Sequence, residues 1–322
     1  MTGHSARYLA AALCCVSAAP ASAQNWPVKP VRLLVPFPPG GGTDIQARLL
    51  SKVFQQDLGQ NFIIDNRTGA GGVIAAQLTA DSPGDGYTLL FTSGSISVVT
   101  TLHANRIKFN VLTDLVPVSW LSSTPLVLSL HPSVPAKSVK ELVALGRQKP
   151  SVFTAGGNDV GSTAHLSAEM FNQMAGLKST IVTYRGGGPA VIALISGEID
   201  YIFATAPSMM PHIKSGKAKA IAVTTEKRSA AFPDLPTMTT FYPGFVTDNW
   251  YAMFFPKNTP PAVVERMNAA VKKALDSTEV KTFMAREALE PVASSPEGLT
   301  AKFKSDQALY AKVIKAANIR LD

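Results

Sequence analysis

Short apolar runs alternate with helical segments along most of the chain. Residues 31–35 and 62–64 are rich in β-branched and apolar side chains, and between them apolar positions recur at helical spacing from Ile45 to Phe54. A second helical segment precedes another apolar run at 87–91. Glycine- and proline-rich turns separate these segments. The alternation predicts β-loop-α units, and therefore an α/β fold with mainly parallel, doubly wound sheets flanked by helices.

The same alternation continues toward the C-terminus. We expect further strands at residues 126–130, 152–154, 180–182, 199–203, 218–223 and 251–255. We expect helices at residues 138–148, 163–174, 260–275 and 296–317, and one more that ends at Ser196. Ser138 is a predicted N-cap, and Pro261 occupies a first helical turn, where proline is tolerated.

Two lobes account for this order of elements. We assign residues 26–125 and 244–322 to the first lobe and residues 126–243 to the second, with crossovers near Pro125 and Pro243 as a hinge. Only one predicted strand lies among the helices that close the chain, which fits a helical cap on the first lobe. The periodicity leaves open that these helices form a unit of their own.

Residues 1–23 have the pattern of a secretory signal peptide. Arg7 is the one cation, no acidic residue is present, and an apolar run precedes the small residues Ala21-Ser22-Ala23. The run is shorter than the ~20 residues that a membrane-spanning helix needs. We expect cleavage after Ala23 and export to the periplasm. Both cysteines, Cys14 and Cys15, would be removed, which suits an oxidising compartment.

The charge of the chain does not indicate a nucleic-acid partner. The formal net charge is +8 at pH 7, but the lysines and arginines are scattered, and no run of five occurs. No aromatic-basic motif of an RNA-binding sheet is present. We expect no nucleic-acid binding, and a basic surface that mildly favours anions.

Motifs for catalysis or for a cofactor are also missing. The glycine-rich segment at 40–44 lacks the third glycine of a dinucleotide fingerprint, and no Gly-Lys-Ser/Thr follows any glycine-rich loop. The histidines after the signal segment do not have metal-ligand spacing; they are His103, His131, His165 and His212. No Gly-x-Ser-x-Gly elbow stands on a strand-to-helix turn. We therefore expect no metal, no cofactor and no enzymatic activity.

Glycine-rich loops carry the candidate chemistry. Loops at 40–44, 69–72, 156–162 and 185–188 each follow a predicted strand and precede a predicted helix. In open α/β sheets ligands bind at this end of the strands. Glycine lets a ligand approach the backbone, and helix N-terminal N–H groups attract anions. The pattern predicts a carboxylate site between the lobes, with the imidazole N–H of His165 as a further donor.

A purely structural interpretation of the same loops remains open. Any one glycine-rich turn can be a tight turn and nothing more. Thr43, Asp44 and Ser162 are also ordinary helix caps, which is compatible with ligand contact.

The motifs in these loops resemble those of a known family, the periplasmic solute receptors of tripartite tricarboxylate transporters, often called Bug proteins. The resemblance runs from Trp26 to near the C-terminus. The matching segments are Trp-Pro-Val-Lys-Pro-Val-Arg at 26–32, Pro-Phe-Pro-Pro-Gly-Gly-Gly-Thr-Asp at 36–44, Ala-Arg at 47–48, Asn-Arg at 66–67, Gly-Ala-Gly-Gly at 69–72, Asp-Gly-Tyr-Thr-Leu at 85–89, Gly-Ser at 161–162, His-Leu at 165–166, Tyr-Arg-Gly-Gly at 184–187, Pro-Ala at 189–190, Pro-Thr at 236–237 and Trp250.

The resemblance implies a two-lobe type II periplasmic-binding-protein fold that closes on a small organic acid and delivers it to membrane permease subunits. In that family the first lobe typically holds one carboxylate through backbone groups and waters, and the second lobe takes the distal group. The candidate ligand-binding residues are Phe37, Gly41, Gly42, Thr43, Asp44, Ala70, Gly71, Ser93, Gly94, Gly156, Ser162, Thr163, His165, Tyr184, Arg185, Gly186, Ala204 and Thr205.

Two departures from the family bear on the ligand. Ala204 and Thr205 stand where relatives often carry an acidic residue, which disfavours an amine-bearing ligand. A plain dicarboxylate, a hydroxy acid or an aromatic acid is favoured instead. Arg185 stands where many relatives have lysine, and its planar fork can grip a carboxylate, unless it is a solvated loop arginine.

Two other functions stay open at this stage. A ligand sensor for a signalling receptor would have the same binding site and a different partner. An enzyme on the same scaffold would need a general base beside a positioned nucleophile, for example if Asp44 and His165 converged. We expect a monomer.

Overall fold

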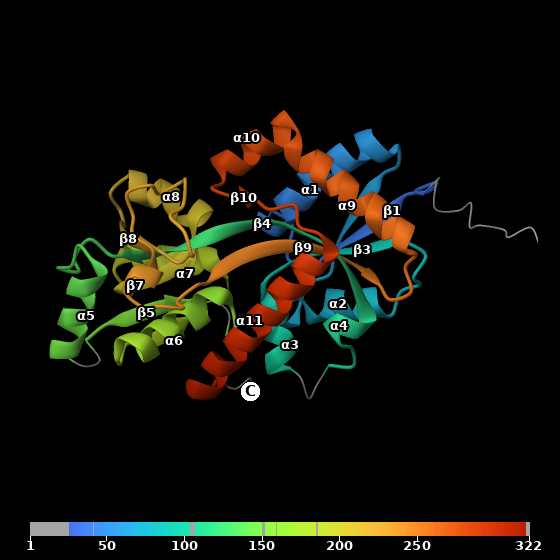
Figure 1. The fold of residues 1–322 in the computed structure, drawn as a ribbon. Coiled ribbons are helices and arrows are strands. Elements are labelled where there is room, and N and C mark those ends of the chain that lie inside the picture. The colour runs from blue at the N-terminus through green and yellow to red at the C-terminus, as the bar shows by residue number, and fades with distance from the viewer. Residues whose placement is uncertain are drawn as a thin grey trace, which may run out of the picture.

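Two half-sheets that share one long strand form the framework of the protein (Figure 1). The computed structural model describes residues 26–40, 42–103, 107–149, 152–158, 160–184 and 186–319. The predicted signal peptide, Gly41 and Arg185 lie outside these residues. Among the described residues, no helix is both long enough and apolar enough to cross a membrane.

The first half-sheet is parallel on one side and antiparallel at its centre. Strand β1 pairs in parallel with its two neighbours β2 and β3, and β9 then pairs antiparallel with β3 and with the first part of β4. The strands are β1 (Val31–Val35), β2 (Phe62–Asn66), β3 (Thr88–Ser93), β4 (Leu115–Leu130), β9 (Asp248–Pro256) and the short β10 (Glu290–Pro291), which pairs with β4.

The second half-sheet begins where the first one ends along β4. The last residues of β4 pair antiparallel with β7 and β8, and β5 joins β7 and β6 in parallel. The strands are β5 (Thr154–Gly157), β6 (Thr180–Thr183), β7 (Tyr201–Thr205) and β8 (Lys219–Val223). The predicted α/β architecture is confirmed, and the antiparallel pairs of β4 and β9 add a mixed centre to the expected parallel strands.

Strand β4 passes from one half-sheet to the other without a break. Pro125 is its last partner of β9, at Asp248, and Leu126 is its first partner of β7, at Thr205. A second connection runs beside it, because the N–H of Leu126 donates to the hydroxyl of Thr224 at 3.0 Å and that hydroxyl donates to the carbonyl of Thr247 at 2.5 Å. The exact lobe boundaries stay a prediction.

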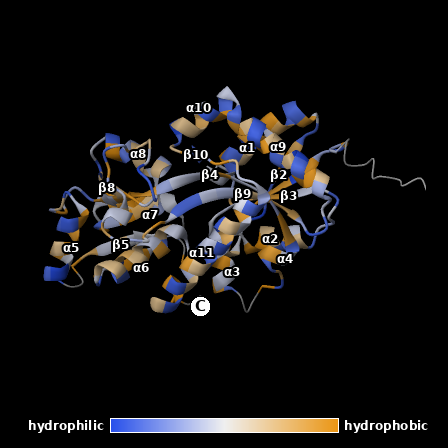
Figure 2. Cartoon of the chain, in the orientation of Figure 1, coloured by the Kyte–Doolittle hydropathy of each residue, from blue (hydrophilic) through white to orange (hydrophobic). Residues whose placement is uncertain are grey.

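Helices cover both faces of each half-sheet. They are α1 (Gly42–Leu58), α2 (Val73–Ala80), α3 (Ser95–Leu102), α4 (Val111–Asp114), α5 (Val139–Gln148), α6 (Thr163–Ala175), α7 (Gly187–Ser196), α8 (Ala206–Lys214), α9 (Pro261–Asp276), α10 (Thr278–Arg286) and α11 (Pro296–Ala316), with 3-10 turns η1 (Ala70–Gly72) and η2 (Met238–Thr240). Figure 2 shows hydrophobic and hydrophilic residues alternating along the outer helices, as amphipathic packing on a sheet requires. The predicted cap Ser138 is confirmed, since its hydroxyl accepts from the N–H of Glu141.

Helix α11 contacts both lobes. Leu299 and Phe303 in its first half belong to the apolar cluster of the first half-sheet. Tyr310 and Val313 in its second half belong to the cluster of the second half-sheet, together with Phe171. Figure 1 shows the helix crossing beside both. The final helix is therefore a bridge between the lobes as well as a cover for the first.

Several predicted strands differ in extent from those observed. Residues 115–125, which were not expected in a strand, form the first part of β4. The strand expected at 152–154 runs from Thr154 to Gly157 instead, and the strand expected at 199–203 runs from Tyr201 to Thr205. Glycines at 156–157 fit in β5 because Gly156 packs directly against Ile199.

Candidate ligand-binding site

The carboxyl ends of the parallel strands in both lobes point at the same junction. In the first lobe, the last residue of β3, Ser93, pairs with Tyr251 near the start of β9. In the second lobe, the last residue of β7, Thr205, pairs with Leu126 immediately beyond the crossover of β4. Because β1 and β2 run parallel to β3, and β5 and β6 parallel to β7, the loops that follow all six strands lie at the junction.

Each half-sheet divides its helices between two faces at this edge. In the first lobe α1 packs over one face, in the cluster of Phe54 and Met267, whereas α2 and α3 pack over the other, in the cluster of Ala75 and Trp250. Since β1 and β3 are neighbours, the loops after them leave in opposite directions. Such a switch point opens a crevice at the strand ends, where ligands bind in open α/β sheets.

Asp44 holds the loop that follows β1. Its side chain is 1% exposed. One carboxylate oxygen accepts from the N–H of Gly40 at 2.9 Å and from Nε of Arg48 at 2.8 Å, and the other accepts from Nδ2 of Asn66 at 3.0 Å. Burial raises the pKa of Asp44, but these hydrogen bonds outweigh burial and leave it below its ordinary value. The carboxylate is thus occupied by donors from the loop, from α1 and from the end of β2.

Asn66 completes this arrangement from the end of β2. Its Nδ2 also donates to the carbonyl of Phe37 at 2.8 Å. Phe37 is therefore tied to the same pair of side chains, and the N-terminus of α1, with Gly42 and Thr43, lies beside it. In the sequence Asn66 is noticed only as part of a matching motif. Its role depends on contacts with Phe37 and Asp44, which are distant from it along the chain.

The turn after β2 lies against the loop after β3. Ala70, Gly71 and Gly72 all have positive φ, at 47°, 63° and 108°. A Cβ on Gly71 would lie 2.5 Å from Cγ1 of Val99, so only glycine fits there. The hydroxyl of Ser95 donates to the carbonyl of Gly71 at 3.3 Å.

Trp250 packs against the loop that follows β3. The N–H of Gly94 donates to the carbonyl of Trp250 at 2.8 Å. A Cβ on Gly94 would lie 2.6 Å from the indole Nε1. Next to this glycine, the hydroxyls of Ser93 and Ser95 share a hydrogen bond of 2.9 Å.

Polar side chains of β4 and β9 lie close to the N-terminal part of α1. Nδ2 of Asn249 donates to the hydroxyl of Tyr251 at 3.0 Å, and the hydroxyl of Ser122 donates to Oε1 of Gln46 at 3.3 Å. A Cβ on Gly42 would stand 3.6 Å from the hydroxyl of Tyr251. Burial raises the pKa of Tyr251 to about 12, so it stays protonated. None of these four polar residues was predicted, because no local pattern in the sequence marks them.

In the second lobe, Ser162 caps helix α6, as predicted. Its hydroxyl accepts from the N–H of His165 at 3.2 Å. His165 is 6% exposed, and its Nδ1 accepts from the N–H of Gly161 at 3.2 Å. Its Nε2 lies 3.8 Å from Oε1 of Glu169. Burial lowers the pKa of His165 and raises that of Glu169. Thr163 begins the helix beside this group and is also buried.

Three more residues that were predicted to bind the ligand make their contacts inside the second lobe. Gly156 lies within β5, where a Cβ would come within 2.2 Å of Ile199. Ala204 is 1% exposed and belongs to an apolar cluster with Ile202. Thr205 precedes α8, and its hydroxyl shares a 3.1 Å hydrogen bond with that of Ser208.

The loop after β6 continues this edge of the second lobe. The N–H of Tyr184 donates to the carbonyl of Gly157 at 3.0 Å, and its hydroxyl donates to Oε1 of Glu198 at 2.7 Å. Burial and Glu198 together raise the pKa of Tyr184 to about 12. Gly186 precedes α7 with φ of 93°, in the left-handed region that glycine favours.

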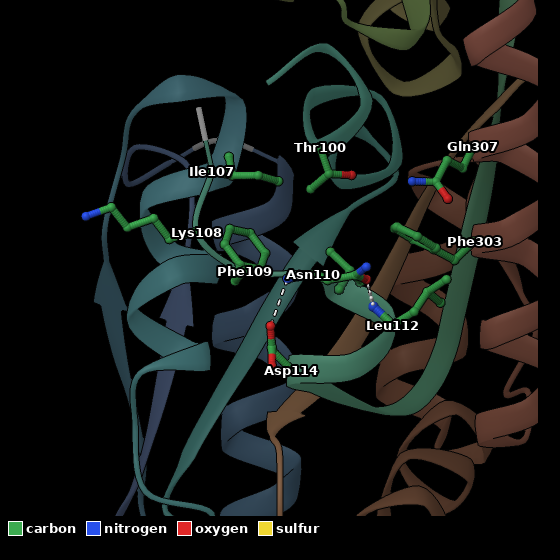
Figure 3. Close-up of a pocket in the computed structure, with 10 residues that line it drawn as sticks. Thr100, Ile107, Lys108, Phe109, Asn110, Leu112, Asp114, Phe303 and Gln307 are labelled. Carbon is green, nitrogen blue, oxygen red and sulfur yellow. Dashed lines mark hydrogen bonds between the residues drawn. The ribbon is translucent and has the colours of Figure 1, made fainter. Parts of the chain in front are cut away.

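A separate pocket of about 480 Å³ lies on the first lobe between α3, α4 and α11 (Figure 3). Figure 3 shows Thr100, Phe303 and Gln307 among the residues that line it. Two of its polar groups are already used, since the side chain of Asn110 accepts from the N–H of Leu112 and that of Asp114 accepts from the N–H of Asn110. Within the described part of the chain, no three His, Cys, Asp or Glu side chains are grouped to hold a metal ion.

Backbone N–H groups and hydroxyls are thus prominent among the described residues of the junction, where Asp44 is paired with Arg48 and Glu198 accepts from the hydroxyl of Tyr184. This combination can bind an anion through helix N-termini. Nδ1 of His165 already accepts the N–H of Gly161, so this nitrogen is not available as a general base toward the junction.

Comparison with known proteins gives consistent similarities. A sequence model described as "Tripartite tricarboxylate transporter family receptor" matches residues 46–319. Protein BugT of Bordetella pertussis is 37% identical over 306 residues, which are 94% of each chain. Among solved structures, R. palustris Rpa4515 with adipate is 34% identical with a TM-score of 0.82, covering 92% of this chain and 99% of that one. MatC from Rhodopseudomonas palustris with bound malate is 29% identical with a TM-score of 0.77, covering 90% and 100%.

Proposed function

Because this chain belongs to the tripartite tricarboxylate transporter receptor family, a family of periplasmic solute-binding receptors rather than enzymes, we propose that it captures a small carboxylate between its two lobes and delivers it to the permease subunits of such a transporter. The signal-peptide pattern of residues 1–23 supports a periplasmic location for this chain. We propose that it acts as a monomer.

The observation that carries the proposal is the convergence of loops at the junction. Strand ends from both lobes face each other there, and helices α1, α3, α6 and α7 all begin there. Their N-termini offer N–H donors and positive partial charge to an anion. A ligand with a carboxylate at each end would engage both lobes at once, which favours closure around it.

The proposed ligand class is a dicarboxylate or hydroxy acid without an amine. Similar proteins have been solved with adipate and with malate. Ala204 lies in an apolar cluster, so no acidic side chain is available at that position to pair with a ligand ammonium group. We include Arg185 as a proposed carboxylate contact of the second lobe.

A thermal-shift screen tests this function. The panel contains adipate, malate, citrate, benzoate, aspartate and ATP. A ligand at about 100 times its Kd adds about 2.7 kcal/mol and raises the Tm by a few degrees. We expect a shift with one class of amine-free acid. A shift with ATP alone, or with no acid, contradicts the proposal, and strong binding of aspartate contradicts the ligand class.

A matched pair of cap variants locates the site. Ser162→Ala and Ser138→Ala each remove a helix N-cap with a 3.2 Å hydrogen bond, one at the junction and one on α5. Each loses about 1 kcal/mol of stability. Only Ser162→Ala is expected to weaken the ligand-induced shift, and equal behaviour of the two argues against a site at α6.

A further inference from the structure

His165 lies in the first turn of α6 with its ring turned back toward the preceding loop. Nδ1 accepts the N–H of Gly161 at 3.2 Å, so in the neutral ring the proton resides on Nε2. Nε2 lies 3.8 Å from Oε1 of Glu169, one helical turn further along. The ring is 6% exposed. The hydrogen bond at Nδ1 is thus made within the second lobe, and the carboxylate of Glu169 is near Nε2 without a hydrogen bond to it.

The burial of this group favours an uncharged imidazole. Burial lowers the pKa of His165 and raises that of Glu169. An imidazolium would lose the acceptor at Nδ1, because both ring nitrogens then carry protons. The hydrogen bond to Gly161 therefore depends on the neutral form that the surroundings favour.

Gly161 lies close to the opposite lobe. Its φ is +80°, and a Cβ there would lie 2.4 Å from Cδ1 of Leu102 and 3.5 Å from Cγ1 of Val98. Both partners belong to α3 of the first lobe. The N–H of Gly161 is buried, and a buried N–H without an acceptor is costly. The imidazole thus keeps Gly161 in the conformation that touches α3.

Gly157 makes room for this arrangement. A Cβ on Gly157 would stand 3.2 Å from both Cα and Cβ of His165 and 3.4 Å from its Cδ2. The end of β5 and the first turn of α6 are therefore in close contact, and the ring fills the space between strand end and loop. The glycines at 157 and 161 and the histidine form one packed unit.

From this geometry we infer that His165 is a positioning residue that holds residues 160–162 against α3 through the Gly161 N–H, and that it does not itself bind the ligand; this rests on the proposed function for the part the loop plays in binding. The ligand then meets the N-terminal N–H groups of α6 at a distance set by this loop. Asp44 has a similar positioning role in the first lobe, where its carboxylate accepts the N–H of Gly40 in the loop after β1.

The tautomer can be measured without any ligand. In protein labelled with ¹⁵N-histidine, NMR distinguishes a protonated from an unprotonated ring nitrogen, and the signals of His165 are those lost in His165→Asn. We expect an unprotonated Nδ1 and a protonated Nε2 at neutral pH. A protonated Nδ1, in either the other tautomer or the imidazolium, overturns the inference.

Two substitutions separate positioning from ligand contact. Asparagine places its Oδ1 near the position of Nδ1 and can accept the Gly161 N–H, whereas glutamine places its amide near Nε2. We expect His165→Asn to bind adipate or malate nearly as the parent does, and His165→Gln to bind about tenfold more weakly, the cost of one unmade buried hydrogen bond. The reverse order would mean that Nε2 contacts the ligand, and overturns the inference.

The two experiments also separate this inference from the proposed function. If the parent protein binds neither acid but shows the expected tautomer, the ligand class fails and the positioning role stands. If it binds an acid but carries the proton on Nδ1, the function stands and the positioning role fails.

Discussion

The indole Nε1 of Trp250 donates a 2.5 Å hydrogen bond to Oδ2 of Asp306, and so joins strand β9 to helix α11 at the junction of the lobes. Lys302 lies beside them, 2.6 Å from Oδ1 of Asp248 and 3.1 Å from Oδ1 of Asp306. Burial raises the pKa of Asp306. Burial alone would lower the pKa of Lys302, but the two carboxylates raise it above its ordinary value.

Removing Asp306 should therefore destabilise the whole protein. Asp306→Ala deprives Lys302 and the Trp250 N–H of a buried partner, with an expected loss of about 3 kcal/mol in the free energy of unfolding. Urea denaturation followed by circular dichroism measures this. Lys52→Ala is the control, because the Lys52–Glu279 pair is exposed and contributes within about 0.5 kcal/mol. Equal losses in both variants would show that the buried cluster contributes no more to the free energy of unfolding than an exposed ion pair does.

The buried imidazole of His165 predicts a pH dependence of stability. Its pKa is lower in the folded protein than the ordinary value of about 6.5 that it has in the unfolded chain. At a pH between these two pKa values the unfolded chain therefore binds the proton more readily than the folded protein does. Stability from this group is complete above about pH 6.5 and falls as the pH is lowered through that window. In His165→Asn the fall should be smaller. Urea midpoints from pH 7.5 to 5 test this, and identical slopes for both proteins would contradict it.

Asp44 should affect both stability and binding. Asp44→Ala removes the acceptor for Gly40, Arg48 and Asn66, with an expected loss of about 2 kcal/mol or more. Because the loop after β1 then loses its tether, affinity for the carboxylate should fall as well. Calorimetry and thermal unfolding measure the two effects. The exposed Asp276→Ala serves as control, and unchanged affinity in Asp44→Ala would show that the tether is not needed for binding.

Alanine substitutions at Gly71 and Gly216 separate the cost of steric overlap from the cost of backbone strain. Gly71→Ala has both, since φ is 63° and the new Cβ meets Val99 at 2.5 Å. Gly216→Ala has strain alone, with φ of 73° and nothing within 4 Å. We expect about 1 kcal/mol for Gly216→Ala and about 1–2 kcal/mol more for Gly71→Ala. Adding Val99→Ala to Gly71→Ala should recover part of the difference in Tm; no recovery would place the cost elsewhere.

Local features of the site were predictable from the sequence, and long-range ones were not. Glycine-rich turns between an apolar run and a helical segment identify strand ends directly, which is why the turns after β1, β2 and β5 were expected close to where they lie, although Gly156 and Gly157 belong to β5 and α1 already begins at Gly42. The cap Ser162 follows from its position before a helical pattern. By contrast, the partnership of Asp44 with Asn66 joins two strands, and no spacing along the chain reveals it.

The first part of β4 shows why some of the fold was missed. It contains Pro117 and several small polar residues, including Ser119, Ser122 and Thr124, so its pattern does not look like a core strand. The strand is nevertheless central, because it pairs with β9 on one edge and its hydroxyls have partners such as Gln46 on α1. The cross-sheet pairing that stabilises these polar positions is invisible in sequence periodicity.

The unbroken run of β4 across the junction has a consequence for the entropy of closure. Both chain connections between the lobes are ordered by hydrogen bonds, at Leu126 and at Thr247, so no flexible linker has to be immobilised when the lobes approach. In the proposed closure these two connections would therefore add little to the conformational entropy that is lost. Less of the binding free energy of a proposed small-acid ligand is then offset, because these two connections are already ordered.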